Sequence, residues 1–289
     1  MDPSRDLADK RYIITGANTG IGRETARALA HRGASVTLAC RSEAKTLPVI
    51  DALRRETGND QLDFVALDLG DLASVRACAG ALRERGGPVH GLINNAGVGG
   101  VRGATKDGFE LAFGTNHLGH FALTLQLLPL LEATPGARII NVSSAVHYRA
   151  KGIEWDALRR PTESFTAMPE YAVSKLANVL FTKELSRRIA PGTVTAYALH
   201  PGIVASDIWR QRLPRPATWL AGKFMQSTAE GARTSVFCAT ATELEGHTGR
   251  YYTDSKEKQP SPLADDRALA AELWERSEAW VRARSSADS

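Results

Sequence analysis

Two side chains near the middle of the sequence have types and spacing that could support acid–base chemistry. Tyr171 and Lys175 are four residues apart in a stretch with helical periodicity, so they project from one face of the predicted helix. A phenol with an ordinary pKa of about 10 is a poor acid or base at neutral pH. We expect the cation of Lys175 to lower the pKa of Tyr171 toward the working range. The pair alone is weak evidence, because this spacing is common on helix surfaces.

A glycine-rich turn near the N-terminus could hold a phosphate. The segment Thr15-Gly-Ala-Asn-Thr-Gly-Ile-Gly22 follows a short apolar run and opens into a helical pattern over about 21–32. Glycines let the backbone turn tightly and approach a pyrophosphate, whose charge is favoured at a helix N-terminus. The segment predicts dinucleotide binding by Gly16, Asn18, Thr19, Gly20, Ile21 and Gly22.

The choice of nucleotide is decided after the second predicted strand, where an acidic side chain would bind the ribose 2′-hydroxyl and a basic one a 2′-phosphate. Arg41 and Ser42 stand there, and Arg23 follows the glycine turn. A guanidinium suits bidentate phosphate recognition, so both arginines favour NADP. Glu43 leaves NAD as the alternative, and the arginines could also be ordinary surface charges.

Strand-like and helical patterns alternate along the chain. Apolar runs span 12–14, 35–39, 62–67, 89–93, 138–142 and 194–199, and helical patterns follow over 43–57, 72–85, 107–131 and 169–189. Continuously apolar strands that alternate with helices predict a parallel sheet covered on both faces. We therefore expect an α/β fold: one doubly wound domain over 1–289 with a mainly parallel sheet of about seven strands. Trp274 and Trp280 indicate a C-terminal helix that packs through aromatic side chains.

Two irregular segments, about 145–168 and 203–226, interrupt this alternation beyond the fifth and sixth strands. Ligands of open α/β sheets bind beyond the carboxyl ends of the strands, so both segments are expected to wall a substrate pocket. Their large side chains would suit a bulky apolar ligand, although they could also serve a subunit interface. These residues are Tyr148, Trp155, Phe165, Met168, Ile208, Trp209, Trp219, Phe224 and Met225.

Composition excludes several classes of protein. The 289 residues hold 36 basic and 32 acidic side chains without a long basic block, so we expect no nucleic-acid partner. Cys40, Cys78 and Cys238 are far apart, and neither a disulfide framework nor a metal site is indicated. No signal peptide or membrane span is recognisable, and we expect a cytoplasmic protein.

Six motifs occur in an order and spacing that resemble the short-chain dehydrogenases/reductases over nearly the whole chain. They are the glycine turn, Asn94-Asn-Ala-Gly97, Asn116, Ser143-Ser144, Tyr171-x-x-x-Lys175 and Pro201-Gly202. The segments 115–121, 174–178, 200–202 and 249–252 resemble the retinol-dehydrogenase-like branch. Typical members of that branch carry a hydrophobic N-terminal anchor, which is not recognisable here, so a membrane location and a retinoid substrate are not carried over.

The resemblance implies a role for each matching residue. Tyr171 would donate the proton in carbonyl reduction, Lys175 would tune it and hold the nicotinamide ribose, and Ser144 would stabilise the carbonyl oxygen. Asn116 would position a water that links Lys175 to solvent. Further cofactor contacts would come from Asp68, Leu69, Asn95, Ala96, Gly97, Pro201, Gly202, Ile203 and Ser206. Ser206 stands where a threonine is common in the family and keeps the hydroxyl group.

These expectations combine into an NADP-dependent oxidoreductase for a bulky hydrophobic carbonyl or alcohol, with reduction favoured. A quinone or aromatic polyketide reductase is an alternative with the same site. A protein that binds NADP without turnover is another, although an intact set of reacting residues argues against it. Family members often form dimers or tetramers through the helices that correspond to 107–131 and 169–189, so a homo-oligomer is possible.

Overall fold

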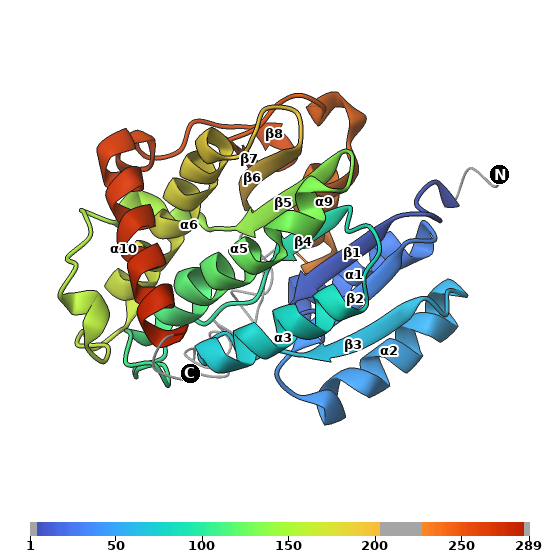
Figure 1. Cartoon of the computed structure of the whole chain (residues 1–289), viewed down its shortest axis with the longest axis horizontal. Coiled ribbons are helices and arrows are strands. Elements are labelled where there is room, and N and C mark those ends of the chain that lie inside the picture. The colour runs from blue at the N-terminus through green and yellow to red at the C-terminus, as the bar shows by residue number, and fades with distance from the viewer. Residues whose placement is uncertain (1–4, 203–226, 286–289) are drawn as a thin grey trace.

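The computed structural model of the protein describes residues 5–202 and 227–285. Its centre is an eight-stranded sheet of order β3-β2-β1-β4-β5-β6-β7-β8 (Figure 1). All neighbouring strands pair in parallel except β7 and β8. The predicted α/β class is confirmed, with one short strand beyond the seven expected. The strands are β1 (Arg11–Thr15), β2 (Ser35–Cys40), β3 (Leu62–Ala66), β4 (Gly91–Asn94), β5 (Ala137–Val142), β6 (Val194–His200), β7 (Arg250–Thr253) and β8 (Lys256–Glu257).

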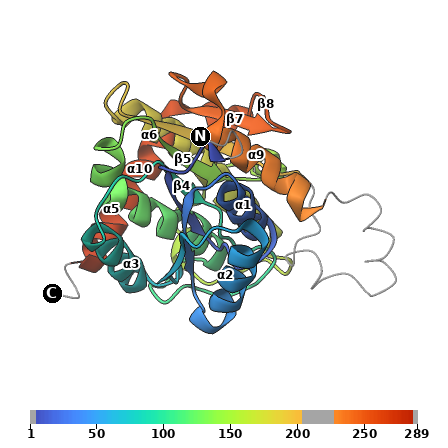
Figure 2. The same ribbon diagram turned by 90° about the vertical axis from the view of Figure 1, so that its right-hand side faces the viewer.

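Helices cover both faces of the sheet (Figure 2). One layer contains α1 (Gly20–His31), α2 (Glu43–Thr57) and α9 (Thr228–Thr240), and the other contains α3 (Leu72–Glu84), α5 (Gly119–Glu132), α6 (Met168–Arg188) and α10 (Arg267–Ser285). Successive strand residues enter opposite cores, as Ile13 and Ile14 of β1 do. After β1 the chain enters the layer of α1, whereas after β4 it enters the opposite layer, which contains α5. The carboxyl ends of β1 and β4 therefore flank the crevice where ligands of such sheets bind.

The predicted helix over 107–131 is shorter and irregular. Gly108 has a φ of +80°, which a helix cannot continue through, and the Asp107 carboxylate accepts the Leu72 backbone N–H of α3 instead. The helical course begins with α4 (Leu111–Phe113), continues as a π-helical segment, η2 (Gly114–Leu118), and becomes α-helical in α5. Such π segments are frequent at functional sites.

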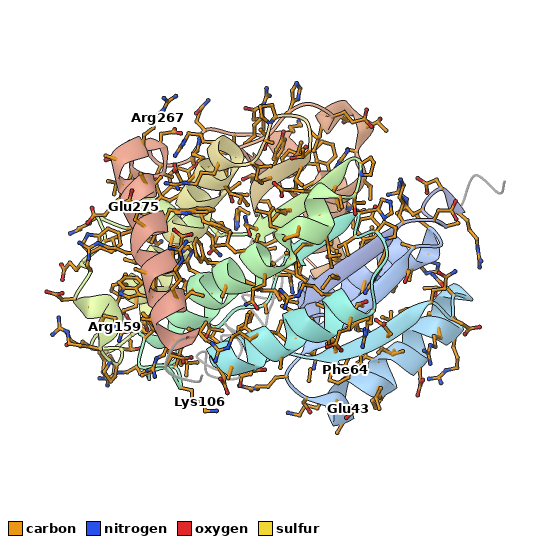
Figure 3. All side chains as sticks on the ribbon, viewed as in Figure 1. Glu43, Phe64, Lys106, Arg159, Arg267 and Glu275 are labelled. Atoms are coloured by element: carbon orange, nitrogen blue, oxygen red, sulfur yellow. The ribbon has the colours of Figure 1, made fainter. Side chains whose placement is uncertain are left out.

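The C-terminal helix α10 lies over α5 and α6 (Figure 1). The Trp274 ring, 7% exposed, packs against Phe121 and Phe181 with centroid distances of 5.0 and 5.8 Å. Arg267 and Glu275 lie on the solvent side of the same helix (Figure 3). The packing role predicted for Trp274 is confirmed. Pairing of two copies through α5 and α6 would have to accommodate α10 on that surface.

Three further features bear on the class of protein. No helix within 5–202 and 227–285 has both the length and the hydrophobicity to cross a membrane. The same residues contain no group of three or more His, Cys, Asp or Glu side chains arranged to hold a metal. Cys40, Cys78 and Cys238 are buried and free.

Removal of the Trp274 ring tests the contribution of α10 to stability. Because this side chain fills the junction of three helices, Trp274→Ala should lower the free energy of unfolding by about 3–5 kcal/mol. Phe165 is 90% exposed, and Phe165→Ala should change the free energy by less than about 0.5 kcal/mol. Urea unfolding measures both values. Equal effects would contradict a packed α10.

Candidate active site

The glycine turn after β1 is shaped by the loop after β4. Gly16 has a φ of +64°, and a Cβ there would lie 2.9 Å from the Ala96 Cβ. A Cβ on Gly22 would lie 2.5 Å from the Asn95 Nδ2 atom. Because both positions exclude a side chain, the backbone forms an open cradle at the start of α1. A pyrophosphate fits such a cradle, which offers unpaired helix N–H groups.

The two loops are joined by hydrogen bonds. The Thr15 hydroxyl oxygen accepts the backbone N–H groups of Asn95 and Ala96, each at 2.9 Å. The Asn95 amide donates to the Thr15 carbonyl at 2.8 Å. The ends of β1 and β4 therefore form one hydrogen-bonded unit.

Two adjoining cavities bring most of the predicted site residues together. The first is lined by Gly16, Asn18, Thr19, Gly20, Ile21, Gly22, Asn95, Ala96, Gly97, Val142, Ser143, Ser144, Tyr171, Lys175, His200, Pro201 and Gly202. The second continues it toward β2 and adds Ala39, Cys40, Arg41, Ser42, Lys45, Leu67, Asp68, Leu69, Val98 and Thr115. The predicted residues Ile203 and Ser206 lie outside the described residues.

The nucleotide end differs from the prediction at two residues. Arg41 and Ser42 line the second cavity, as expected, and Lys45 from the first turn of α2 joins them. Arg23 lines neither cavity, and its guanidinium pairs with Glu56 near the other end of α2 at 3.2 Å. Lys45 lies three residues after Ser42, on the first turn of the helix, and this spacing could have identified it as a further cation beside the nucleotide.

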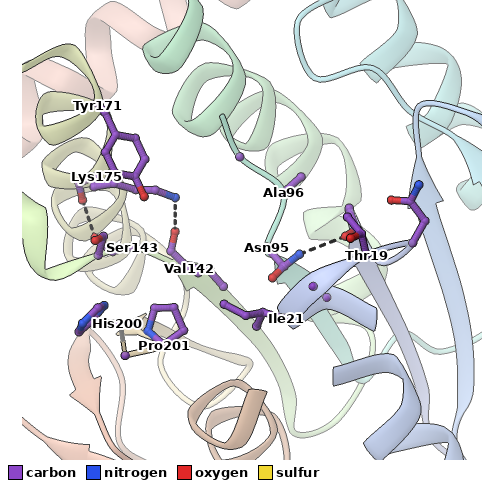
Figure 4. Close-up of a pocket in the computed structure, with 17 residues that line it drawn as sticks. Thr19, Ile21, Asn95, Ala96, Val142, Ser143, Tyr171, Lys175, His200 and Pro201 are labelled. Carbon is purple, nitrogen blue, oxygen red and sulfur yellow. Dashed lines mark hydrogen bonds between the residues drawn. The ribbon is translucent and has the colours of Figure 1, made fainter. Parts of the chain in front are cut away.

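Tyr171 and Lys175 stand together on α6 and face the first cavity (Figure 4). The Lys175 Nζ atom donates to the Val142 carbonyl at the end of β5, at 2.9 Å, and lies 5.7 Å from the centre of the Tyr171 ring. The Ser143 hydroxyl donates to the Lys175 carbonyl at 2.7 Å, which ties α6 to the end of β5. Ser144 follows directly and lines the same cavity.

Burial dominates the titration of both groups. It raises the pKa of Tyr171 to about 12, against which a hydrogen bond with Ser144 acts more weakly. It lowers the pKa of Lys175 to about 8. The sequence predicted a lowered pKa for Tyr171, but desolvation of the phenolate raises it instead. The phenol is therefore protonated at neutral pH.

Asn116 lies in the π-helical segment, and its side chain is fully engaged. The amide nitrogen donates to the Val98 carbonyl and the Ser174 hydroxyl, both at 2.9 Å, while the amide oxygen accepts the Val98 N–H at 2.8 Å. The side chain therefore holds the β4 loop against α6. Positioning of a water by Asn116 remains a prediction.

The segment 145–168 contains the short helices η3 (Ala145–Arg149) and η4 (Ala157–Arg159) and lines a third cavity of about 800 Å³. Met168 lines this cavity, whereas Tyr148, Trp155 and Phe165 do not. Trp155 instead stacks with the Arg276 guanidinium at 4.7 Å. The predicted wall residues Ile208, Trp209, Trp219, Phe224 and Met225 fall outside the described part of the chain.

Sequence reasoning also missed His200, which lines the first cavity at the end of β6. Burial lowers the pKa of this imidazole to about 4, so His200 is neutral at physiological pH. Its position directly before Pro201-Gly202 was a signal that could have identified it.

The buried ammonium of Lys175 makes stability depend on pH. The pKa of Lys175 is about 8 in the folded protein, whereas a lysine exposed to water in the unfolded chain has the ordinary value of 10.5. The unfolded chain therefore binds this proton more tightly. The cost of burial is fully present below pH 8 and is relieved as pH rises toward 10.5. Lys175→Met should therefore raise the free energy of unfolding by about 1–3 kcal/mol at pH 7.

This gain should shrink as pH rises above about 8, where the lysine of the folded protein loses its proton, and should vanish above 10.5, where the unfolded chain has lost it as well. Urea unfolding at several pH values measures the difference between the two proteins. Lys183 on the same helix pairs with Asp265, and Lys183→Met should give no such gain. A gain for Lys175→Met that is independent of pH would contradict the burial argument.

Comparison with known proteins identifies the family. The family model described as short chain dehydrogenase matches residues 10–156. Mouse retinol dehydrogenase 12 is 44% identical over 270 residues, which cover 93% of this chain and 85% of that protein. Human retinol dehydrogenase 13 is 42% identical over 284 residues, with coverages of 93% and 83%.

Solved structures agree in fold. A crystal structure of an uncharacterized protein from Mycobacterium paratuberculosis has a TM-score of 0.76 and 34% identity, covering 96% of this chain and 97% of that one. A short chain dehydrogenase from Shigella flexneri, complexed with NADP, has a TM-score of 0.70 and 22% identity, with coverages of 88% and 100%. The chain belongs to the short-chain dehydrogenase/reductase family, in the retinol-dehydrogenase-like branch.

Proposed function

We propose that this protein is an NADP-dependent oxidoreductase that transfers hydride between NADPH and a bulky hydrophobic carbonyl or alcohol, with reduction favoured. The observation that carries the proposal is the pair of adjoining cavities. They extend from the basic side chains of Arg41 and Lys45, past the glycine turn, to Tyr171 and Ser144. Such a shape suits a dinucleotide whose reactive ring lies beside a proton donor.

The protein residues at the reactive end would handle the proton and the developing charge. NADPH supplies the hydride when it is bound. The Tyr171 phenol is protonated at neutral pH because burial raises its pKa to about 12, so it can donate its proton to the substrate oxygen. Ser144 donates a hydrogen bond to the same oxygen and stabilises its negative charge. Lys175 holds the nicotinamide ribose beside Tyr171, as the family resemblance implies.

The choice of NADP is supported by the basic end of the second cavity. Arg41, Ser42 and Lys45 line it, and a guanidinium, a hydroxyl and an ammonium together complement a 2′-phosphate. Glu43 is exposed on α2 and does not line the cavity. This arrangement favours NADP over the alternative, NAD.

The substrate is expected to bind against the 145–168 segment. The third cavity is bounded by Val146, two residues beyond Ser144, and by Met168 and Ala172 on either side of Tyr171. Its volume of about 800 Å³ is within the range of small-molecule sites. The relatives named retinol dehydrogenases support an alcohol–carbonyl pair as the reacting group.

Turnover is tested by NADPH consumption against hydrophobic aldehydes, bulky ketones, steroids and polycyclic quinones. Tyr171→Phe should abolish turnover and leave the Kd for NADPH near wild type, because the phenyl ring keeps the packing and loses the proton. Tyr148, whose hydroxyl donates to the Gln259 carbonyl, provides the control Tyr148→Phe, which should retain turnover. Retained activity in Tyr171→Phe would exclude its role as proton donor. Faster reduction of quinones than of ketones would favour the alternative substrate class.

The cofactor assignment is tested by removing single cations. Arg41→Ala and Lys45→Ala should each raise the KM for NADPH about tenfold, because a charge-assisted hydrogen bond contributes about 1.5–3 kcal/mol. The KM for NADH should change little. Arg23→Ala is the matched control, since its guanidinium pairs with Glu56 away from the cavity. A large NADPH effect in Arg23→Ala, or none in Arg41→Ala, would contradict the assignment.

A further inference from the structure

Two buried histidines follow Asn116 along one helical course, His117 in η2 and His120 in α5, and they face different parts of the molecule. His117 and His120 are 1% and 2% exposed. The His117 Nε2 atom contacts the Ser277 hydroxyl of α10 at 3.1 Å. The His120 ring instead lies between the Thr15 hydroxyl, 2.8 Å from Nε2, and the Asn116 carbonyl, 2.9 Å from Nδ1. His120 therefore bridges the end of β1 and the π-helical segment.

The direction of the first hydrogen bond follows from the Thr15 hydroxyl. Its oxygen has two lone pairs, and both are occupied by the N–H groups of Asn95 and Ala96. The hydroxyl proton must then be donated. The His120 Nε2 atom is the nearer acceptor at 2.8 Å, against 3.5 Å for the Ile93 carbonyl. Nε2 is therefore the unprotonated nitrogen of His120.

The direction of the second hydrogen bond follows from the first. A neutral imidazole with a free Nε2 carries its proton on Nδ1, which donates to the Asn116 carbonyl. A second proton on Nε2 would face a hydroxyl that has no lone pair left. Burial also favours the neutral ring, as does the positive charge of Lys175, and together they lower the pKa of His120 to about 4. The environment thus fixes one charge state and one tautomer.

Hydrogen bonds continue from Asn116 to the proton donor. The Asn116 amide donates to the Ser174 hydroxyl at 2.9 Å, and this hydroxyl donates to the Tyr171 carbonyl at 2.8 Å. The same amide holds both backbone groups of Val98. A chain of hydrogen bonds therefore connects the phosphate-binding turn, through His120 and Asn116, to the first turn of α6.

We infer that His120 is a positioning residue for the proposed hydride transfer. Its neutral ring accepts from Thr15 and donates to Asn116, and it thereby holds the dinucleotide turn and the helix that faces Lys175 in one fixed arrangement. This inference rests on the proposed function. It implies that the two nitrogens serve separable purposes: Nε2 supports cofactor binding, and Nδ1 supports the geometry of the reacting groups.

Two polar substitutions separate these purposes. A glutamine amide reaches the position of Nε2, and an asparagine amide reaches that of Nδ1. His120→Gln should keep the Kd for NADPH within about twofold of wild type and lower kcat about tenfold, because only the Asn116 bond is lost. His120→Asn should raise this Kd about tenfold and keep kcat at saturating NADPH within about threefold. His120→Phe should change both quantities.

The neighbouring histidine provides the matched control. His117→Gln, His117→Asn and His117→Phe alter an equally buried ring on the same helical course, one that faces α10. These variants should lose stability to urea as the His120 variants do, with a Kd for NADPH and a kcat near wild type. The Kd is measured by fluorescence titration with NADPH and kcat by its consumption with the best substrate of the panel.

A double-mutant cycle tests the Thr15 contact directly. Thr15→Val removes the hydroxyl that contacts His120 Nε2. His120→Gln breaks the bond to the Asn116 carbonyl instead, so it should lower kcat in the Thr15→Val protein as it does in wild type. His120→Asn should not raise the Kd for NADPH further, because the contact that it breaks is already absent. Thr15→Ser should restore the wild-type Kd. Additive effects of Thr15→Val and His120→Asn on this Kd would overturn the inference.

The remaining outcomes are also decisive. If the His120 variants and the His117 variants change Kd and kcat to the same extent, then His120 only fills space and the inference is wrong. The same conclusion follows if His120→Gln and His120→Asn have the same effects on Kd and kcat. If His120→Phe does not fold, the Gln and Asn variants carry the test, since each retains one bond. A wild-type protein that binds NADPH without turnover contradicts the proposed function, while the Kd measurements still test His120. Absence of NADPH binding by wild type would overturn both.

Discussion

The site depends on one constraint, the burial of the Lys175 ammonium group away from water. Lys175 is 4% exposed and is held by the Val142 carbonyl, a weak substitute for water around a full charge. The fold tolerates this cost because α6 is packed along its length, with Trp274 of α10 against Phe181. The helix that carries Tyr171 and Lys175 is therefore stabilised at a distance from them, and the position of the ammonium is fixed by the core.

The dinucleotide cradle is likewise made by more than one local motif. The glycine turn has its shape because the loop after β4 leaves no space for a Cβ at Gly16, and Thr15 bonds that loop to β1. The same loop continues to Val98, which Asn116 holds. The glycine turn and the first turn of α6, which carries Tyr171, therefore share one hydrogen-bonded support.

The sequence predicted the alternation of strands and helices and most of the residues around the two cavities, because buried strands and glycine turns are set by local pattern. It could not predict features that depend on distant neighbours. Arg23 lines neither cavity, and its guanidinium pairs with Glu56, which is 33 residues away in the sequence. The pKa of Tyr171 moves upward because of its burial, which spacing along the helix does not reveal. The π-helical segment was missed because its residues have ordinary helical periodicity.

On the proposed mechanism, burial of Tyr171 and Lys175 also favours one direction of proton transfer after reduction. Burial raises the pKa of Tyr171 and lowers that of Lys175, so the ammonium is the stronger acid of the two. Once the phenol has given its proton to a substrate, transfer of a proton from Lys175 to the phenolate is downhill, and it replaces two buried charges by two neutral groups. The burial that makes Lys175 costly in the resting protein thus favours restoration of the proton donor. On the proposed mechanism, the burial that lowers stability at this residue also serves turnover.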